Sequence, residues 1–304
     1  MVAPATRSAN LRDLLDPAIL AGLSNLDLVA RSVVEGVMMG LHRSPTFGFS
    51  QEFAEYRGYS EGDDPRFIDW NVYARTDRIV VKRFLGETNS HLMLLLDASA
   101  SMGFGSTPVS KLRYAQMLAA SLAYLASRQH DAVGCLIFDE QVRDFRRPSS
   151  RHGQLQSVLH CLDAAVPRIG TRFATPFERM RAQIKRRGIV AVISDFYCDA
   201  DELIASVQPL AWQAQDIILL QVLADEELTP GFANNVLLED METGAAVEVA
   251  PSYLRDIYPE RLRAHIDRIA KAAAGIGADH VQVATSDRLD VALRNYLLFR
   301  GRRQ

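Results

Sequence analysis

Short apolar runs that alternate with amphipathic segments are the feature that most limits what this chain can fold into. From residue 91 onward the sequence predicts strands at 91–97, 131–139, 189–195, 216–225 and 279–285. It predicts helices at 111–129, 153–165, 175–188, 199–212, 259–277 and 288–300. Short, almost wholly apolar strands separated by helices are typical of a parallel sheet that is covered on both faces. We therefore expect an α/β fold with a doubly wound, mostly parallel sheet and helices on both faces.

Two hairpins are expected to interrupt this alternation. One joins the strand at 131–139 to a partner around 142–145, and the other turns at Thr243 and Gly244. Both are additions to the parallel sheet and do not change the predicted fold class.

The first 90 residues follow a different pattern. Helical spacing predicts helices at 10–23 and 24–42, the second with Ser24 as its cap and Asp27 in its first turn. Residues 45–90 are rich in glycine, aromatic and charged residues, and only 79–84 looks like a strand. Their aromatic content argues against disorder. We expect a helical segment at 1–44, a region at 45–90 that packs on the main domain, and the main domain at 91–304.

Composition excludes several classes of function. A net charge of −3 over 304 residues gives no global attraction to nucleic acid or to an anionic membrane. The basic clusters KRRG, from Lys185, and FRGRRQ are expected to be solvated helix ends, with RNA binding as a weaker alternative. The three cysteines form no CxxC pair, which argues against a zinc site or a disulfide framework. No signal peptide and no apolar stretch of about 18 residues is present, so we expect a cytoplasmic protein without a membrane span.

Polar side chains follow two of the apolar strands at the point where each strand ends. Asp97 closes the run LMLLLD, and Ser99 and Ser101 follow at alternate positions, which predicts that their side chains lie on one side of the loop. Asp195 closes the run IVAVISD, and Thr171 lies at the start of a helix between the two strands. Because parallel strands end at the same edge of a sheet, we expect these two carboxylates and three hydroxyls to lie together there.

These five groups are hard oxygen donors, the ligands that Mg²⁺ or Mn²⁺ takes in proteins. Too few of them are anionic to saturate such an ion. The sequence therefore predicts a metal site with a position open to a carboxylate from another protein.

Two simpler interpretations stay open. Asp97 could cap the turn after its strand, while Ser99 and Ser101 bond to loop backbone groups. Asp195 could cap the helix that starts near Asp199. In either case the polar residues would serve the loop backbone and not a metal ion.

The run DASAS, with Thr171 and Asp195 after it in this order, resembles the metal-ion-dependent adhesion site of von Willebrand factor A domains. The resemblance covers about residues 91–285. It implies a Mg²⁺ (or Mn²⁺) held by Asp97, Ser99, Ser101, Thr171 and Asp195, with an Asp or Glu of a partner completing the coordination. Arg172 departs from the usual pattern, in which an acidic, amide or small residue follows the threonine, so Thr175 is an alternative to Thr171.

A second stretch, EYRGYSEGDDPRFIDWNVYARTDRIVVKRF, is similar to the signature of the bacterial family known as domain of unknown function 58. The matching residues are Tyr59, Gly62, Asp63, Asp64, Arg66, Ile68, Asp69, Trp70, Ala74 and Arg75. With this stretch, the resemblance covers about residue 40 to the C-terminus. It implies a von Willebrand A-like domain preceded by the signature region. It also implies a MoxR-type AAA+ ATPase as partner, because genes of the family often neighbour those of such ATPases.

We therefore expect a non-enzymatic, metal-dependent protein-interaction module that acts as an adaptor or chaperone partner of a MoxR-type ATPase. The partner-binding residues expected in the signature region are Gly62, Asp63, Asp64, Arg66, Asp69, Trp70 and Arg75. The acidic residues there are expected to pair with nearby arginines. Trp70 is expected to be a core anchor between the signature region and the main domain, with a ligand platform as the alternative. The alternative function is a metal-dependent phosphoester hydrolase that uses the same ion with help from Asp63 and Asp64.

Overall fold

The chain divides into two units. The larger unit consists of Met1–Met38 together with Ser90–Gln304, and the smaller unit is Met39–Asn89. The structure, a computed structural model, describes residues 15–23, 25–41, 52–60, 68–85, 91–105, 109–168, 170, 172–184, 186–241 and 244–303. The expected packing of residues 45–90 on the main domain stays a prediction.

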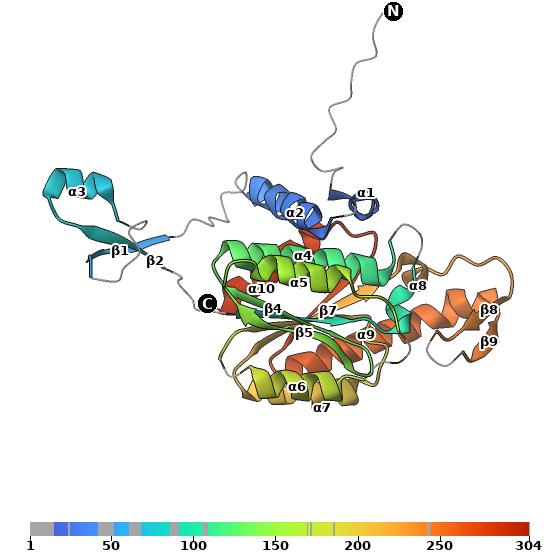
Figure 1. Ribbon diagram of the computed structural model, residues 1–304. Helices are drawn as coiled ribbons and strands as arrows, with labels where there is room; N and C mark the ends of the chain where they lie inside the picture. The colour runs from blue at the N-terminus through green and yellow to red at the C-terminus, as the bar shows by residue number, and fades with distance from the viewer. Residues whose placement is uncertain are drawn as a thin grey trace, which may run out of the picture. The chain divides into compact units, whose positions relative to one another are not determined.

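A six-stranded sheet forms the centre of the larger unit (Figure 1). Its strands, in spatial order, are β10 (Asp279–Ala284), β7 (Asp216–Leu223), β6 (Ile189–Ser194), β3 (His91–Asp97), β4 (Ala132–Phe138) and β5 (Val142–Ser149). The first five run parallel, and β5 pairs antiparallel with β4 at the edge. The predicted fold class is confirmed.

Helices cover both faces of this sheet (Figure 1). On one face lie α4 (Lys111–Arg128), α5 (Gln154–Asp163) and α10 (Leu289–Arg303), and on the other lie α6 (Ala174–Gln183), α7 (Ala200–Trp212) and α9 (Tyr258–Gly275). Two N-terminal helices, α1 (Pro17–Ala21) and α2 (Leu26–Leu41), lie on the side of α4. The Arg113 guanidinium on α4 donates to the Leu23 carbonyl at 3.1 Å and ties this segment to the larger unit.

Burial on both faces explains why β3 is apolar at every position between its two ends. All seven residues of β3 are buried, because helices cover the strand from both sides. Met93 and Leu95 join the core that α6, α7 and α9 share, and the alternate leucines of the strand face the opposite layer. α6 was predicted to reach residue 188 but ends at Gln183, because Ile184 turns into extended backbone and enters the same core.

Several short elements lie between the main strands and helices of the larger unit. They are a 3₁₀ turn (Ala100–Gly103), α8 (Asp225–Leu228), the hairpin of β8 (Val236–Glu239) and β9 (Ala246–Val249), and a π-helical turn (Tyr253–Ile257) that leads into α9. β8 and β9 pair only with each other in the described part of the chain, as the predicted hairpin requires.

The smaller unit contains β1 (Glu52–Gly58), α3 (Trp70–Thr76) and β2 (Val80–Leu85). The strand predicted at 79–84 corresponds to β2, and it pairs antiparallel with β1, which was not predicted. Asp69 starts α3, because its carboxylate accepts from the backbone N–H groups of Asn71 at 3.0 Å and Val72 at 3.2 Å. Asp77 ends the helix with a left-handed backbone, φ 56°.

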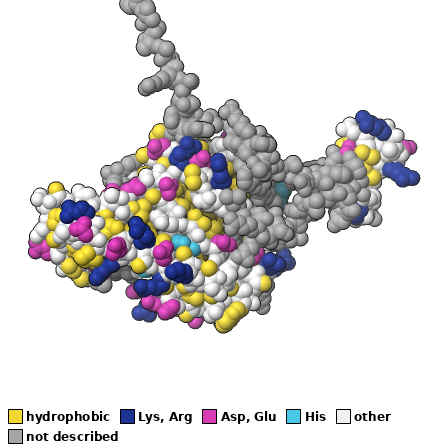
Figure 2. All heavy atoms as spheres, turned by 180° about the vertical axis from the view of Figure 1, so that it is seen from behind, with side chains coloured by type: hydrophobic (Ala, Val, Ile, Leu, Met, Phe, Trp, Pro, Cys, Tyr) yellow, Lys and Arg dark blue, Asp and Glu magenta, His cyan; other side chains and the backbone are white. Residues whose placement is uncertain are grey.

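The surface of the larger unit has a mixed charge. On the face seen in Figure 2, basic and acidic side chains are interspersed among apolar ones, in keeping with the small net charge of −3. None of the helices described is at once long enough and apolar enough to cross a membrane.

Candidate metal centre

The carboxyl ends of β3 and β6 lie next to each other at the point where the strand order reverses. From β3 the chain continues to β4 on one side of β3 and later returns to β6 on the other side. In open α/β sheets this position leaves a crevice that commonly binds ligands. Asp97 ends β3 and Ser194 ends β6, and the Ser194 hydroxyl donates to Asp97 Oδ2 at 2.6 Å across the crevice.

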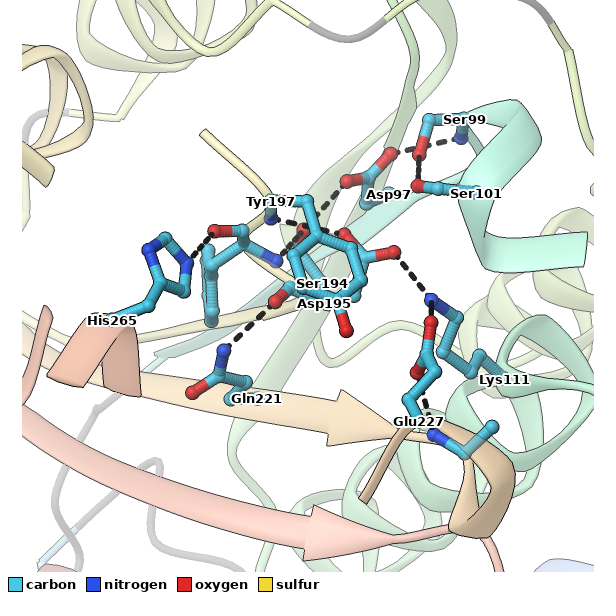
Figure 3. Close-up of polar contacts among 12 residues, drawn as sticks. Asp97, Ser99, Ser101, Lys111, Ser194, Asp195, Tyr197, Gln221, Glu227 and His265 are labelled. Carbon is cyan, nitrogen blue, oxygen red and sulfur yellow. Dashed lines mark hydrogen bonds and ion pairs between the residues drawn. The ribbon is translucent and has the colours of Figure 1, made fainter. Parts of the chain in front are cut away.

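The loop after β3 brings the three oxygen-bearing residues of DASAS together. Asp97 Oδ1 accepts from the backbone N–H of Ser99 at 2.9 Å, and the hydroxyls of Ser99 and Ser101 lie 3.1 Å apart (Figure 3). Asp97 and Ser99 are fully buried. The turn-capping contact weighed from the sequence is therefore present, and the hydroxyl pair lies beside it.

A buried lysine that the sequence did not point to lies on the other side of the site. Lys111 Nζ donates to Asp195 Oδ2 at 2.7 Å and to Glu227 Oε1 at 2.6 Å, and its side chain is fully buried (Figure 3). The ammonium lies 4.8 Å from the centre of the Tyr197 ring and 5.8 Å from that of Phe104, within the range of cation–π attraction. Lys111 thus joins α4 to the ends of β6 and β7.

The local sequence carries weak signals for the ion pair of Lys111 and Glu227. Lys111 is the first residue of α4, directly after Ser110, whose hydroxyl caps the helix at Arg113 N. Glu227 lies just beyond the carboxyl end of β7, and its second oxygen accepts from Ala224 N at 2.8 Å. Both positions are at the edge where ligands gather, so an ionic role could have been suspected.

The loop after β6 is held by bonds from three elements, which fixes the position of Asp195. Phe196 adopts a left-handed backbone, φ 53°, and donates its N–H to the Ser194 hydroxyl at 3.0 Å. Its carbonyl accepts from His265 Nε2 on α9 at 2.9 Å, and the Asp195 carbonyl accepts from Gln221 Nε2 on β7 at 2.9 Å.

The interpretation of Asp195 as a helix cap is wrong. The cap of α7 is Asp199, whose carboxylate accepts from the N–H groups of Asp201 at 2.9 Å and Glu202 at 3.2 Å. Asp195 instead bonds to Lys111 and, through Oδ1, to the N–H of Tyr197 at 3.3 Å. Its carboxylate therefore remains at the edge of the sheet.

The electrostatics of the cluster leave Asp97 without a counter-charge. Within the described part of the chain, Lys111 pairs with Asp195 and Glu227, and Asp97 has no cationic partner. Burial, together with the charge of Asp195, raises the pKa of Asp97 to about 7, although hydrogen bonds from Ser194 and Ser99 act in the opposite direction. Burial also raises the pKa of Glu227, against the pull of Lys111.

These features fit a divalent cation. Three carboxylates and one ammonium give the cluster a formal charge of −2 when all four groups are ionised, which a divalent ion would neutralise. The donors around Asp97 are carboxylate and hydroxyl oxygens, which suit Mg²⁺ or Mn²⁺. No group of three or more His, Cys, Asp or Glu side chains among the described residues is arranged to hold a metal ion. Hydroxyls would therefore have to supply part of the coordination here.

Comparison with known proteins identifies the family. Residues 55–268 match the family described as "Protein of unknown function DUF58". The chain belongs to this family. An uncharacterized protein of Mycobacterium tuberculosis (strain H37Rv), Rv1480, is 30% identical over 287 residues, which cover 90% of this chain and 87% of the relative. The family resemblance seen in the signature region is thus confirmed.

Solved structures at low sequence identity are similar to the DUF58 chain over its larger part. The conserved hypothetical protein BatB from Bacteroides thetaiotaomicron is 18% identical, with a TM-score of 0.45, over 68% of this chain and 97% of that protein. An aerotolerance-related membrane protein from Bacteroides fragilis is 17% identical, with a TM-score of 0.47, over 68% of this chain and 96% of that protein.

Several predicted site residues of this DUF58 protein lie outside the described residues. Thr171 lies outside them, as do Gly62, Asp63, Asp64 and Arg66. Thr175, the alternative to Thr171, is exposed in the first turn of α6.

Three of the expected partner-binding residues are described, namely Asp69, Trp70 and Arg75, and they belong to α3 and its cap in the smaller unit. Asp69 caps that helix, a role that the acidic-cluster interpretation did not include. The expectation that Trp70 is a core anchor between the signature region and the main domain stays a prediction. The Trp70 side chain is 60% exposed and meets Tyr73 edge to face, with the ring centres 6.1 Å apart.

Proposed function

We propose that this DUF58 protein is a non-enzymatic protein-interaction module whose binding depends on Mg²⁺ or Mn²⁺ at the carboxyl edge of its sheet. The observation that carries the proposal is the grouping of Asp97, Ser99 and Ser101 beside Asp195, in a buried cluster with a formal charge of −2. A carboxylate without a cationic partner at the switch point of the sheet supports the binding of a cation there.

Some of these residues are proposed to ligate the ion directly, and one is proposed to act through water. Asp97, Ser99 and Ser101 would ligate it directly, and Thr171 stays the proposed third hydroxyl. Lys111 already occupies one oxygen of Asp195, so Asp195 is proposed to act through a water molecule. Because hydroxyls are neutral, the bound ion would keep enough positive charge to attract a carboxylate from the partner.

A MoxR-type AAA+ ATPase is the partner proposed for this module. Membership of the DUF58 family supports this choice, because the family resemblance implies such an ATPase as partner. The partner would offer an Asp or Glu to the ion, and the signature region would add further contacts through Asp69, Trp70 and Arg75.

Binding to a purified MoxR-type ATPase from the same organism, measured by biolayer interferometry, tests the proposal. Asp97→Asn keeps the size of the side chain and removes its charge, whereas the control Asp199→Asn removes a carboxylate from the cap of α7 and keeps its capping ability. We expect wild type and Asp199→Asn to bind in Mg²⁺ and Asp97→Asn to bind at least about tenfold more weakly. Equal binding by all three proteins, or binding that EDTA leaves unchanged in wild type, would contradict the proposal.

A further inference from the structure

A groove with a volume of about 420 Å³ adjoins the candidate metal centre. Ser101 and Lys111 belong to both, so the groove opens directly beside the cluster. Its other walls come from the loop after β6, from α8 and the segment after it, from the β8–β9 hairpin, and from the turn that leads into α9. A ligand that reaches the edge of the sheet would therefore pass over this groove.

The walls of the groove expose large apolar side chains. Five of them are between 40% and 47% exposed, namely Phe104, Tyr197, Phe232, Leu238 and Met241. They come from four separate stretches of the chain, so the fold and not one local sequence gathers them. Exposed apolar side chains that line one concave surface are typical of a site for another protein.

The charge of the lining is negative. Four carboxylates, of Glu226, Glu227, Glu239 and Asp240, stand against the one ammonium of Lys111, which gives a formal charge of −3. That ammonium already bonds to two carboxylates of the cluster. An occupant of this groove is therefore favoured when it carries positive charge next to its apolar part.

We propose that the groove binds an extended segment of the partner protein in which an apolar side chain, such as Leu, is flanked by Lys or Arg. This inference rests on the proposed function for the identity of the partner, whose carboxylate would lie at the neighbouring ion. The apolar side chain contacts Phe232 and Leu238, and the flanking cations face Glu226 and Glu239. None of these contacts requires a metal ion.

Short fluorescent peptides test the groove by itself, with fluorescence anisotropy measured in EDTA. The probes carry Lys-Leu-Lys, Glu-Leu-Glu or Lys-Ser-Lys at the centre of a neutral sequence without Asp. We expect only the Lys-Leu-Lys peptide to bind wild type. Leu238→Ser should weaken that binding about tenfold, whereas the control Val247→Ser, an exposed position on the same hairpin that does not line the groove, should not.

Charge reversal gives a second readout that loss of folding would not produce. Glu239→Lys should weaken binding of the Lys-Leu-Lys peptide and should strengthen binding of the Glu-Leu-Glu peptide. Failure of wild type to bind any probe, equal binding by wild type and Leu238→Ser, or a preference of wild type for Glu-Leu-Glu would overturn the proposal. A dimer in sedimentation that Leu238→Ser dissolves would assign the groove to a second copy of the chain and would also overturn it.

A Lys-Leu-Lys peptide extended by an Asp separates this proposal from that of the metal centre. If Mg²⁺ tightens its binding to wild type and Leu238→Ser has no effect, the groove proposal fails and the proposed function stands. If the peptide binds wild type but not Leu238→Ser, with no effect of Mg²⁺ or of Asp97→Asn, the groove proposal stands and the metal-dependent function fails.

Discussion

Replacing Lys111 with methionine should lower the stability of the larger unit markedly. The ammonium makes two short ion pairs, at 2.7 Å to Asp195 and at 2.6 Å to Glu227. The acceptor Asp195 is buried and Glu227 is largely buried, with side-chain exposures of 3% and 12%. Methionine fills a similar volume and keeps the contacts with Phe104 and Tyr197, so the expected effect is electrostatic.

The expected loss in free energy of unfolding follows from the burial of the two carboxylates that pair with Lys111. Removal of one partner from a buried ion pair costs about 3–5 kcal/mol, because the remaining charge stays without compensation. For a unit of this size, roughly 2–4 °C of melting temperature correspond to each kcal/mol, which gives a decrease of about 6–20 °C. An exposed ion pair would contribute only about 0–1 kcal/mol.

Urea and thermal unfolding in EDTA at pH 8 measure this effect. The double variant Lys111→Met, Glu227→Gln should recover part of the loss, because it removes one of the two carboxylates that had been paired with Lys111. Saturating Mg²⁺ should stabilise Lys111→Met more than wild type, since the variant cluster has a formal charge of −3 and attracts a cation more strongly. A loss below about 1 kcal/mol for Lys111→Met would refute the inference that these ion pairs are buried and coupled.

Three further changes test the structure around the site. Gly134→Ala would place a Cβ 2.6 Å from a backbone carbonyl of β5 and should destabilise by about 1–3 kcal/mol. Gly231→Ala, with nothing within 4 Å, should be nearly neutral in the same urea titration, and equal effects would contradict the close β4–β5 approach. Asp199→Ala should cost about 1 kcal/mol by removing the cap of α7, and retained stability would argue against that cap. Burial lowers the pKa of His91 below its usual value of 6.5, so the unfolded chain takes up the proton first and stability falls as the pH drops through and below 6.5. His91→Gln should show a shallower loss between pH 7 and pH 5 in urea titrations, and an unchanged slope would contradict the burial of a neutral imidazole.

The fold could be predicted because burial on both faces leaves a clear record in the sequence. β3 and β6 are apolar at nearly every position, and helices of regular spacing separate them, so the order of elements could be followed along the chain. Asp97 marked the end of β3 because a charged residue after such a run can lie only at the edge of the sheet.

Contacts between distant residues could not be predicted in the same way. Lys111 and Glu227 are 116 positions apart, and a lysine at the start of a helix is normally exposed. Its burial depends on the end of β7 lying close to the start of α4, which only the folded sheet brings about. The groove has the same origin, because its five apolar side chains come from four stretches that have no sequence pattern in common.

The smaller unit was the least predictable part of the fold. β1, with the sequence EFAEYRG, has little apolar alternation. It belongs to a two-stranded sheet, which buries little apolar surface and so leaves only a weak hydrophobic pattern in the sequence. α3 has only seven residues, and its start depends on the capping side chain of Asp69, which had been interpreted as part of an ionic cluster. Whether a polar residue caps a helix depends on the local backbone, which the sequence alone does not show.

The central claim is that Asp97 belongs to a site for a divalent cation. Calorimetric titration of Mn²⁺ into the metal-free chain and into Asp97→Asn tests it most directly, with circular dichroism to show that both proteins are folded. We expect saturable binding by wild type that the variant lacks, because Asp97 is the carboxylate of the cluster that forms no ion pair with Lys111. Equal binding by both proteins, or no binding by wild type, would contradict it.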